Sequence, residues 1–248
     1  MIGLVRNEWK KVFLPVLLTT VLLAIAMSVL SCTIYQNYVL HYDLEAWEVG
    51  TELFSLLYPL FVVVPLCWNL YYERKNNFLL YVMPRVKIKK YLTAKWIAYA
   101  LGTLCIIVIP YILSAVFAIY VKPPVVPFVE NPFSHIFENA FIKAPLLYAV
   151  ALSLLVSLFV MTFGFVLALY CKNIFVILTG PFMYSILENF VLAILRLERL
   201  RLVVAFDPTT INPEVVSIFS FFFGPIVLSI VIGLTAFLLS KKNAIVTI

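Results

Sequence analysis

The chain has 248 residues, of which 64% are hydrophobic and 12% are charged, and its formal net charge is +6. Soluble globular domains average roughly 45 to 50% apolar residues and about 25% charged residues. This composition therefore excludes an ordinary soluble fold, which would expose large apolar patches. It also excludes a disordered chain, because disorder requires low hydrophobicity and high charge. The sequence predicts a protein whose solvent is the lipid bilayer.

Six apolar windows are long enough to cross a membrane, since a hydrocarbon core about 30 Å thick needs about 20 helical residues. The windows are 12–34, 53–72, 96–121, 144–171, 173–195 and 215–240. They are apolar on every face, whereas strands of a membrane barrel alternate over segments of about 10 residues. We therefore expect an all-α polytopic membrane protein with six transmembrane helices, forming a single transmembrane domain over residues 1–248.

The first 13 residues precede the first window and are amphipathic. On a helical period one side carries apolar residues and the other sides carry charges, so this segment is expected to lie in the membrane interface as an elbow helix. The apolar side is formed by Ile2, Val5, Trp9 and Phe13, and the charged positions are Arg6, Glu8, Lys10 and Lys11. An equally weighted alternative is a basic anchor that only sets the topology.

The connection 73–95 is longer than a simple turn between two spans. It contains an apolar run from Phe78 to Met83 that is too short to span, followed by Pro84 and five basic residues. Proline disfavours helical geometry at the residue before it, so the run is expected to end there. A positive topology signal would need only the basic residues. We therefore favour a cytoplasmic loop whose short helix contacts a partner protein.

The fifth window contains the only charged residue of the six windows, Glu188. A carboxylate within a membrane span is costly and marks a candidate functional site. Glu188 is a candidate for the lining of a substrate or proton pathway. The preferred alternative is that it shapes the outer end of its helix, with Asn189 beside it and Arg196 eight residues on.

Two segments between the later spans are expected at the outer surface. Alternating leucines and charges over Leu195 to Val203 predict a short amphipathic piece there. Phe133 to Phe141, after a proline-rich stretch, is a candidate interfacial helix.

The distribution of basic residues predicts the orientation, because short cytoplasmic loops are enriched in Lys and Arg. With the N-terminus in the cytoplasm, the outer side holds five of the 18 basic residues, and both termini lie inside. The inner set is Arg6, Lys10, Lys11, Arg74, Lys75, Arg85, Lys87, Lys89, Lys90, Lys95, Lys172, Lys241 and Lys242. The net charge is thus explained by topology and by attraction to membrane lipids with anionic headgroups. No nucleic-acid partner is expected.

Motifs for catalysis and cofactor binding are missing from the sequence. None of the seven glycines are spaced as a Walker A loop requires, so ATP is not expected to bind this chain by that route. The two histidines, His41 and His135, lie in loops at no ligand spacing, and neither H-E-x-x-H nor G-x-S-x-G is present. We therefore expect no catalytic residue, no metal site and no cofactor on this chain.

The layout of the chain resembles the ABC-2 type permeases, the membrane subunits of one class of ATP-binding cassette exporter. The resemblance covers the N-terminal amphipathic segment, the six spans and the loop from Glu73 to Lys95. In that family the loop begins with an acidic-basic pair, here Glu73-Arg74. It continues through a leucine-rich run, a proline with a basic residue, and a lysine at the third span. This sequence has Asn76-Asn77 where the family has a glycine step.

The resemblance implies a coupling helix from Phe78 to Lys90 that binds a separate ATPase subunit, with Glu73 and Arg74 at the inner mouth of the pathway. The residues implied in coupling are Glu73, Arg74, Phe78, Leu79, Leu80, Pro84, Arg85, Lys87, Lys90 and Lys95.

The resemblance further implies a non-catalytic permease subunit in a multi-pass arrangement in a bacterial plasma membrane, paired with itself or with a second permease. ATP and Mg²⁺ would be bound by the partner ATPase. The small size is similar to that of permeases for peptide-antibiotic export or immunity, which implies an amphipathic or hydrophobic substrate. The alternative is a non-transporting scaffold or sensor subunit of a membrane complex.

Overall fold

The computed structural model describes residues 1–37, 45–82, 84–121, 145–206 and 218–242. The described residues form helices and turns, with no β-strand among them. Six of the helices are long and apolar enough to cross a membrane, which confirms the expected all-helical membrane fold. They are α1 (Ile2–Thr33), α2 (Glu45–Lys75), α4 (Ile88–Tyr120), α5 (Pro145–Tyr170), α6 (Ile174–Ile194) and α8 (Ile218–Lys242).

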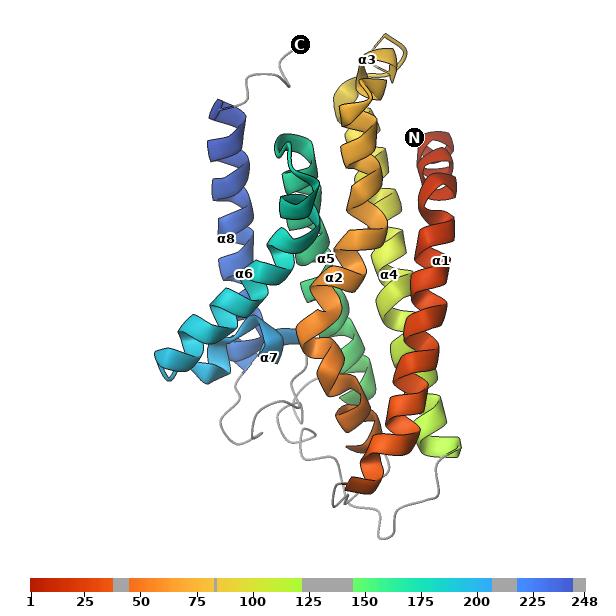
Figure 1. Cartoon of the computed structure of the whole chain (residues 1–248), viewed down its shortest axis with the longest axis vertical. Coiled ribbons are helices and arrows are strands. Elements are labelled where there is room, and N and C mark those ends of the chain that lie inside the picture. Colours follow the sequence, from red (N-terminus) through yellow and green to blue (C-terminus); the bar gives the residue numbers. More distant parts are fainter. Residues whose placement is uncertain (38–44, 83, 122–144, 207–217, 243–248) are drawn as a thin grey trace.

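Helix α2 lies at the centre of the bundle and contacts α1, α4, α5 and α6, as Figure 1 shows. The most extensive packing between two helices joins α1 to α4, while α8 packs on α5. The core between these helices includes Val63, Leu66 and Met161, all fully buried. Helices α6 and α8 are the least buried spans, and most of their apolar surface is not covered by the rest of the described chain.

Three of the helices are longer than a membrane requires. Helix α1 has 32 residues, α2 has 31 and α4 has 33. At 1.5 Å per residue, each is about 45 to 50 Å long, against a hydrocarbon core of about 30 Å. Their uncharged stretches stop short of the end at which α1 begins, so about three turns of α1, about two turns of α4 and the last turn of α2 extend beyond the apolar layer at that end. The short helix α3 (Phe78–Val82) lies at the tip of this extension (Figure 1).

The N-terminal segment does not form a separate elbow helix. Residues 2–13 continue without a break into the first span as part of α1, so the expected interfacial helix is not confirmed. The physical reason lies in Glu8, which is buried against neighbouring helices and does not face water. Contacts of Glu8 and Lys11 with α2 and α4 hold this end of α1 in line with the bundle.

At the opposite end, α1 and α2 approach each other closely through two small residues. A Cβ added at Gly50 of α2 would lie only 2.7 Å from the backbone Cα of Ser31 in α1. The two helices can therefore come this close only because residue 50 has no side chain.

The segment after α6 differs in part from the expected amphipathic surface piece. The first part, η3 (Glu198–Leu200), has no buried residue, as expected. The second part, α7 (Leu202–Phe206), is inserted into the bundle, where Leu202 and Phe206 are almost fully buried. The ring of Phe206 stacks on Tyr58 of α2 with centroids 3.9 Å apart, and Ser153 of α5 donates a 2.6 Å hydrogen bond to the Phe206 carbonyl. This end of the bundle is thus closed by α7.

Several sequence expectations lie outside the described residues. They are the candidate interfacial helix Phe133–Phe141 and the two histidines, His41 and His135.

Candidate functional site

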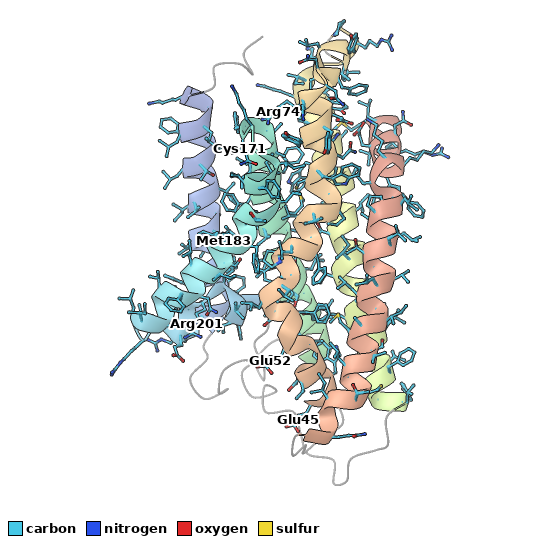
Figure 2. All side chains as sticks on the ribbon, in the orientation of Figure 1. Glu45, Glu52, Arg74, Cys171, Met183 and Arg201 are labelled. Carbon is cyan, nitrogen blue, oxygen red and sulfur yellow. The ribbon has the colours of Figure 1, made fainter. Side chains whose placement is uncertain are left out.

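The basic residues that were expected on the inner side gather at one end of the bundle. The end that carries α3 holds all thirteen basic residues of the expected inner set, since α1 begins there, α2 and α8 end there, and α5 and α6 are joined there. Figure 2 shows Arg74 at this end and Glu45 and Glu52 at the other. The thirteen residues of the inner set therefore lie at one end of the bundle, and this basic end is the candidate functional site.

Helix α3 presents apolar and aromatic side chains to the outside. Phe78 is 40% exposed, Leu80 is 54% exposed and Tyr81 is 74% exposed. Because a five-residue helix is too short to cross a bilayer, these side chains project from the end of the bundle, next to the basic residues that follow. An exposed apolar patch with a polar rim is typical of a protein-binding surface.

The expected coupling helix from Phe78 to Lys90 is not one helix. Helix α3 ends at Val82, a turn contains Pro84 and Arg85, and α4 begins at Ile88. In this turn the backbone N–H groups of Arg85 and Val86 both donate to the carbonyl of Val82, at 3.0 Å, and the turn separates the two helices. Of the other residues implied in coupling, Leu79 is half-buried, while Pro84, Arg85, Lys87 and Lys90 are exposed.

The turn between α2 and α3 depends on Asn77. Its φ angle of 55° lies in the left-handed region, and Asn76 and Asn77 donate backbone hydrogen bonds to the carbonyls of Tyr72 and Arg74. Asparagine is the residue other than glycine that most readily adopts this conformation. Asn77 therefore performs the role of a glycine at the end of α2, and the departure from the glycine step leaves the turn intact.

Beneath α3, five side chains from three helices form a charge cluster: Glu8 and Lys11 from α1, Glu73 from α2, and Tyr91 and Lys95 from α4. Lys11 Nζ lies 2.6 Å from Glu8 and 2.9 Å from Glu73. Lys95 Nζ lies 3.1 Å from Glu8 and also pairs with Glu73. The Tyr91 hydroxyl donates a 2.8 Å hydrogen bond to Glu73.

The charge cluster is neutral as a whole, and three of its four charged side chains are shielded from water, while that of Lys11 is 35% exposed. The Lys95 side chain has no exposed surface, and those of Glu8 and Glu73 are 5% and 10% exposed. Two carboxylates and two ammonium groups balance each other, which is what allows charges to be buried at all. The sequence-based reasoning identified Glu73 and Lys95 but missed the partners Glu8, Lys11 and Tyr91. The available signal was the spacing of Glu8 and Lys11, which places both on one side of a helix.

The charge cluster also contacts α3 directly. The ammonium of Lys11 lies 5.0 Å from the centroid of the Phe78 ring, at the first residue of α3, in a cation–π arrangement. Lys11 therefore contacts both the exposed short helix and the buried charges beneath it.

Arg74 points away from the charge cluster. Its guanidinium donates a hydrogen bond to the backbone carbonyl of Cys171, which joins the end of α2 to the turn between α5 and α6 (Figure 2). Burial raises the pKa of the Cys171 thiol, and the positive charge of Arg74 offsets part of that rise. The thiol thus stays neutral near pH 7, and the carbonyl is the partner of Arg74. Adjacent residues 73 and 74 consequently connect α2 to opposite sides of the bundle.

Glu188 lies far from this site and has a structural contact. Both of its carboxylate oxygens accept from the backbone N–H of Leu202, at 3.0 and 3.1 Å. This N–H is at the first residue of α7, where helical N–H groups have no acceptor within the helix. Glu188 therefore fixes the start of α7, a contact that the sequence-based alternatives for this residue did not include.

Across the described parts of the chain, no three His, Cys, Asp or Glu side chains lie close enough together to hold a metal ion. No known protein family, curated protein or solved structure matches this chain.

Proposed function

We propose that this chain is the membrane-spanning permease subunit of an ATP-binding cassette exporter, as the resemblance to ABC-2 permeases implies. A separate ATPase subunit binds at the basic end and drives alternating access. The observation that carries this proposal is α3, because its exposed Phe78, Leu80 and Tyr81 project beyond the bundle above a buried charge cluster.

The length and the apolar composition of the connection between α2 and α4 favour a docking role for α3. A connection that only set the membrane topology would need basic residues but no apolar helix at its tip. The exposed side chains of α3 are flanked in the chain by the exposed basic residues Lys75, Arg85 and Lys87, so we expect the complementary surface to have an apolar pocket with an acidic rim.

The orientation follows from the positive-inside rule. The end with α3 carries the thirteen basic residues, so it faces the cytoplasm, where ATP is available. Both termini then lie inside, and α7 closes the bundle at the outer side of a bacterial plasma membrane.

Transport requires a second membrane half, because cassette ATPases hydrolyse ATP as a pair. The chain pairs with a copy of itself or with a related permease. Closure of the two ATPases displaces α3, and the helices attached to it reorient the pathway toward the outside. The substrate is an amphipathic or hydrophobic molecule such as a peptide antibiotic, in keeping with the apolar spans.

The alternative function is a scaffold or sensor subunit that does not transport. A scaffold or sensor subunit would have the same membrane topology as a permease, but substitutions in α3 would not change ATP hydrolysis. Measurement of ATP hydrolysis in α3 variants therefore distinguishes the two proposed functions.

The test is purification of the tagged chain from its native membranes in mild detergent, followed by measurement of ATP hydrolysis. Leu80→Ser with Tyr81→Ser should insert normally but lose the co-purifying ATPase activity. Ile119→Ser with Tyr120→Ser alters a matched exposed pair at the opposite end of the bundle and should retain it. Equal activity in both variants, or no activity in the unaltered chain, would contradict the proposal.

A further inference from the structure

The charge cluster divides into two neutral pairs. One pair lies within α1, where Lys11 is 2.6 Å from Glu8. The other joins α2 to α4, where Lys95 pairs with Glu73 and Tyr91 donates a further hydrogen bond to Glu73. The attraction between the two pairs consists of Lys11 with Glu73 at 2.9 Å and Lys95 with Glu8 at 3.1 Å. The Glu8 oxygen that faces Lys95, Oε2, accepts no hydrogen bond.

The division into two neutral pairs affects how easily α1 can separate from α2 and α4. A buried ion pair normally resists separation, because each partner would be left as an unpaired charge. Here the separation of α1 from α2 and α4 leaves Glu8 with Lys11 and leaves Glu73 with Lys95. Opening loses the two attractive contacts between the pairs, but neither side acquires a net charge, so the cost of leaving an unpaired charge is avoided.

The apolar contacts of this end of α1 are few. Among residues 1–11, Glu8 is the only buried one. Trp9 is partly buried against the core, and Val12 is the first fully buried apolar residue. Ionic contacts therefore contribute an unusually large share of what holds about three turns of α1 against the rest of the bundle.

We propose that residues 2–11 of α1 form a separable contact with α2 and α4, which opens and closes at the charge cluster while both sides remain neutral. This inference depends only on the arrangement of the charges. If the proposed function also holds, Lys11 links the contact to Phe78 of α3, so that movement of a docked ATPase reaches α1 through this link.

The experiment measures the distance between α1 and α4 directly. Spin labels are attached at Asn7→Cys and Thr93→Cys, two exposed positions on these helices, in a chain whose four native cysteines are replaced by alanine. The protein is reconstituted alone in lipid nanodiscs, and the distance distribution is recorded by electron paramagnetic resonance. No ATPase is needed, so a failure of the proposed function would leave this measurement valid.

The decisive variant combines Glu8→Lys with Lys11→Glu. It keeps a neutral pair within α1 and leaves the α2–α4 pair untouched, but it makes both contacts between the pairs repulsive. We expect the population with the longer label distance to become the majority, with the protein still folded. The matched control adds Glu73→Lys and Lys95→Glu, which restores attraction across the contact and should restore the original distribution.

Two results would overturn the inference. One is an unchanged distance distribution in the double variant, which would mean that α1 is held by its apolar packing. The other is unfolding of the double variant at a temperature as low as that of Lys95→Met, because a separable contact requires each side to tolerate opening. A second double variant, Glu8→Gln with Lys11→Met, removes the α1 pair without repulsion and should show an intermediate shift.

Discussion

Lys95 of α4 is completely buried, and its ammonium lies 3.1 Å from the carboxylate of Glu8 on α1. The same lysine pairs with Glu73 of α2. A single buried cation thus connects three helices at the basic end of the bundle, at the boundary between the apolar spans and the short helix α3.

Removal of this cation should destabilise the protein more than removal of a balanced pair. Lys95→Met leaves two carboxylates facing only Lys11, and loss of one partner of a buried ion pair typically costs about 3 to 5 kcal/mol. Glu8→Gln with Lys95→Met leaves the neutral pair of Lys11 and Glu73, 2.9 Å apart, and should cost less. Thermal unfolding in detergent would test this order of stabilities. A double variant that is less stable than Lys95→Met would contradict the prediction.

The turn at Asn77 should tolerate glycine but not a β-branched residue. Asn77→Gly preserves the left-handed conformation and should leave stability nearly unchanged. Asn77→Val forces a branched side chain into that conformation and should cost about 1 to 2 kcal/mol. The unfolding midpoints of the variants check this, with Asn76→Val as the control, because Asn76 lies in the same turn but does not have a positive φ angle. Equal losses of stability at both positions would show that the left-handed conformation of residue 77 is not the cause of the destabilisation.

Phe206 should contribute strongly to the stability of the end of the bundle at which α7 is inserted. Phe206→Ala removes the stacking partner of Tyr58 and leaves a cavity, and such truncations typically cost about 3 to 5 kcal/mol. Phe219→Ala truncates a 63% exposed phenylalanine and should have little effect on stability. The free energy of unfolding of both variants tests this, and similar losses would argue against α7 as a packed element.

Glu188 should act through its contact with Leu202. Glu188→Ala leaves the Leu202 N–H without its acceptor, which should cost about 1 to 3 kcal/mol. Glu188→Gln keeps an acceptor oxygen and should recover most of this loss. A pathway role would give the opposite pattern, in which both variants are stable and both lose transport.

The six spans could be predicted from the sequence because a long apolar window with almost no charge forms few structures other than a membrane helix. The sequence also predicted the exposed apolar run at Phe78 and its end before Pro84, since proline acts locally. It could not predict the burial of Glu8, because an acidic residue in an N-terminal segment looks identical whether it faces water or a lysine 87 positions away. The insertion of α7 was missed for the same reason, since its burial depends on Tyr58 and Ser153 of distant helices.

The most direct test of the central claim is photo-crosslinking in native membranes from a photoreactive residue placed at Tyr81 of α3. Tyr120 of α4 is 80% exposed, lies at the opposite end of the bundle and serves as the matched control position. The account predicts a crosslinked product at position 81 that contains a cassette ATPase, identified by mass spectrometry and by labelling with a photoreactive ATP analogue, and no such product at position 120. Absence of the ATPase at position 81, or an equal yield of it at both positions, would contradict the account.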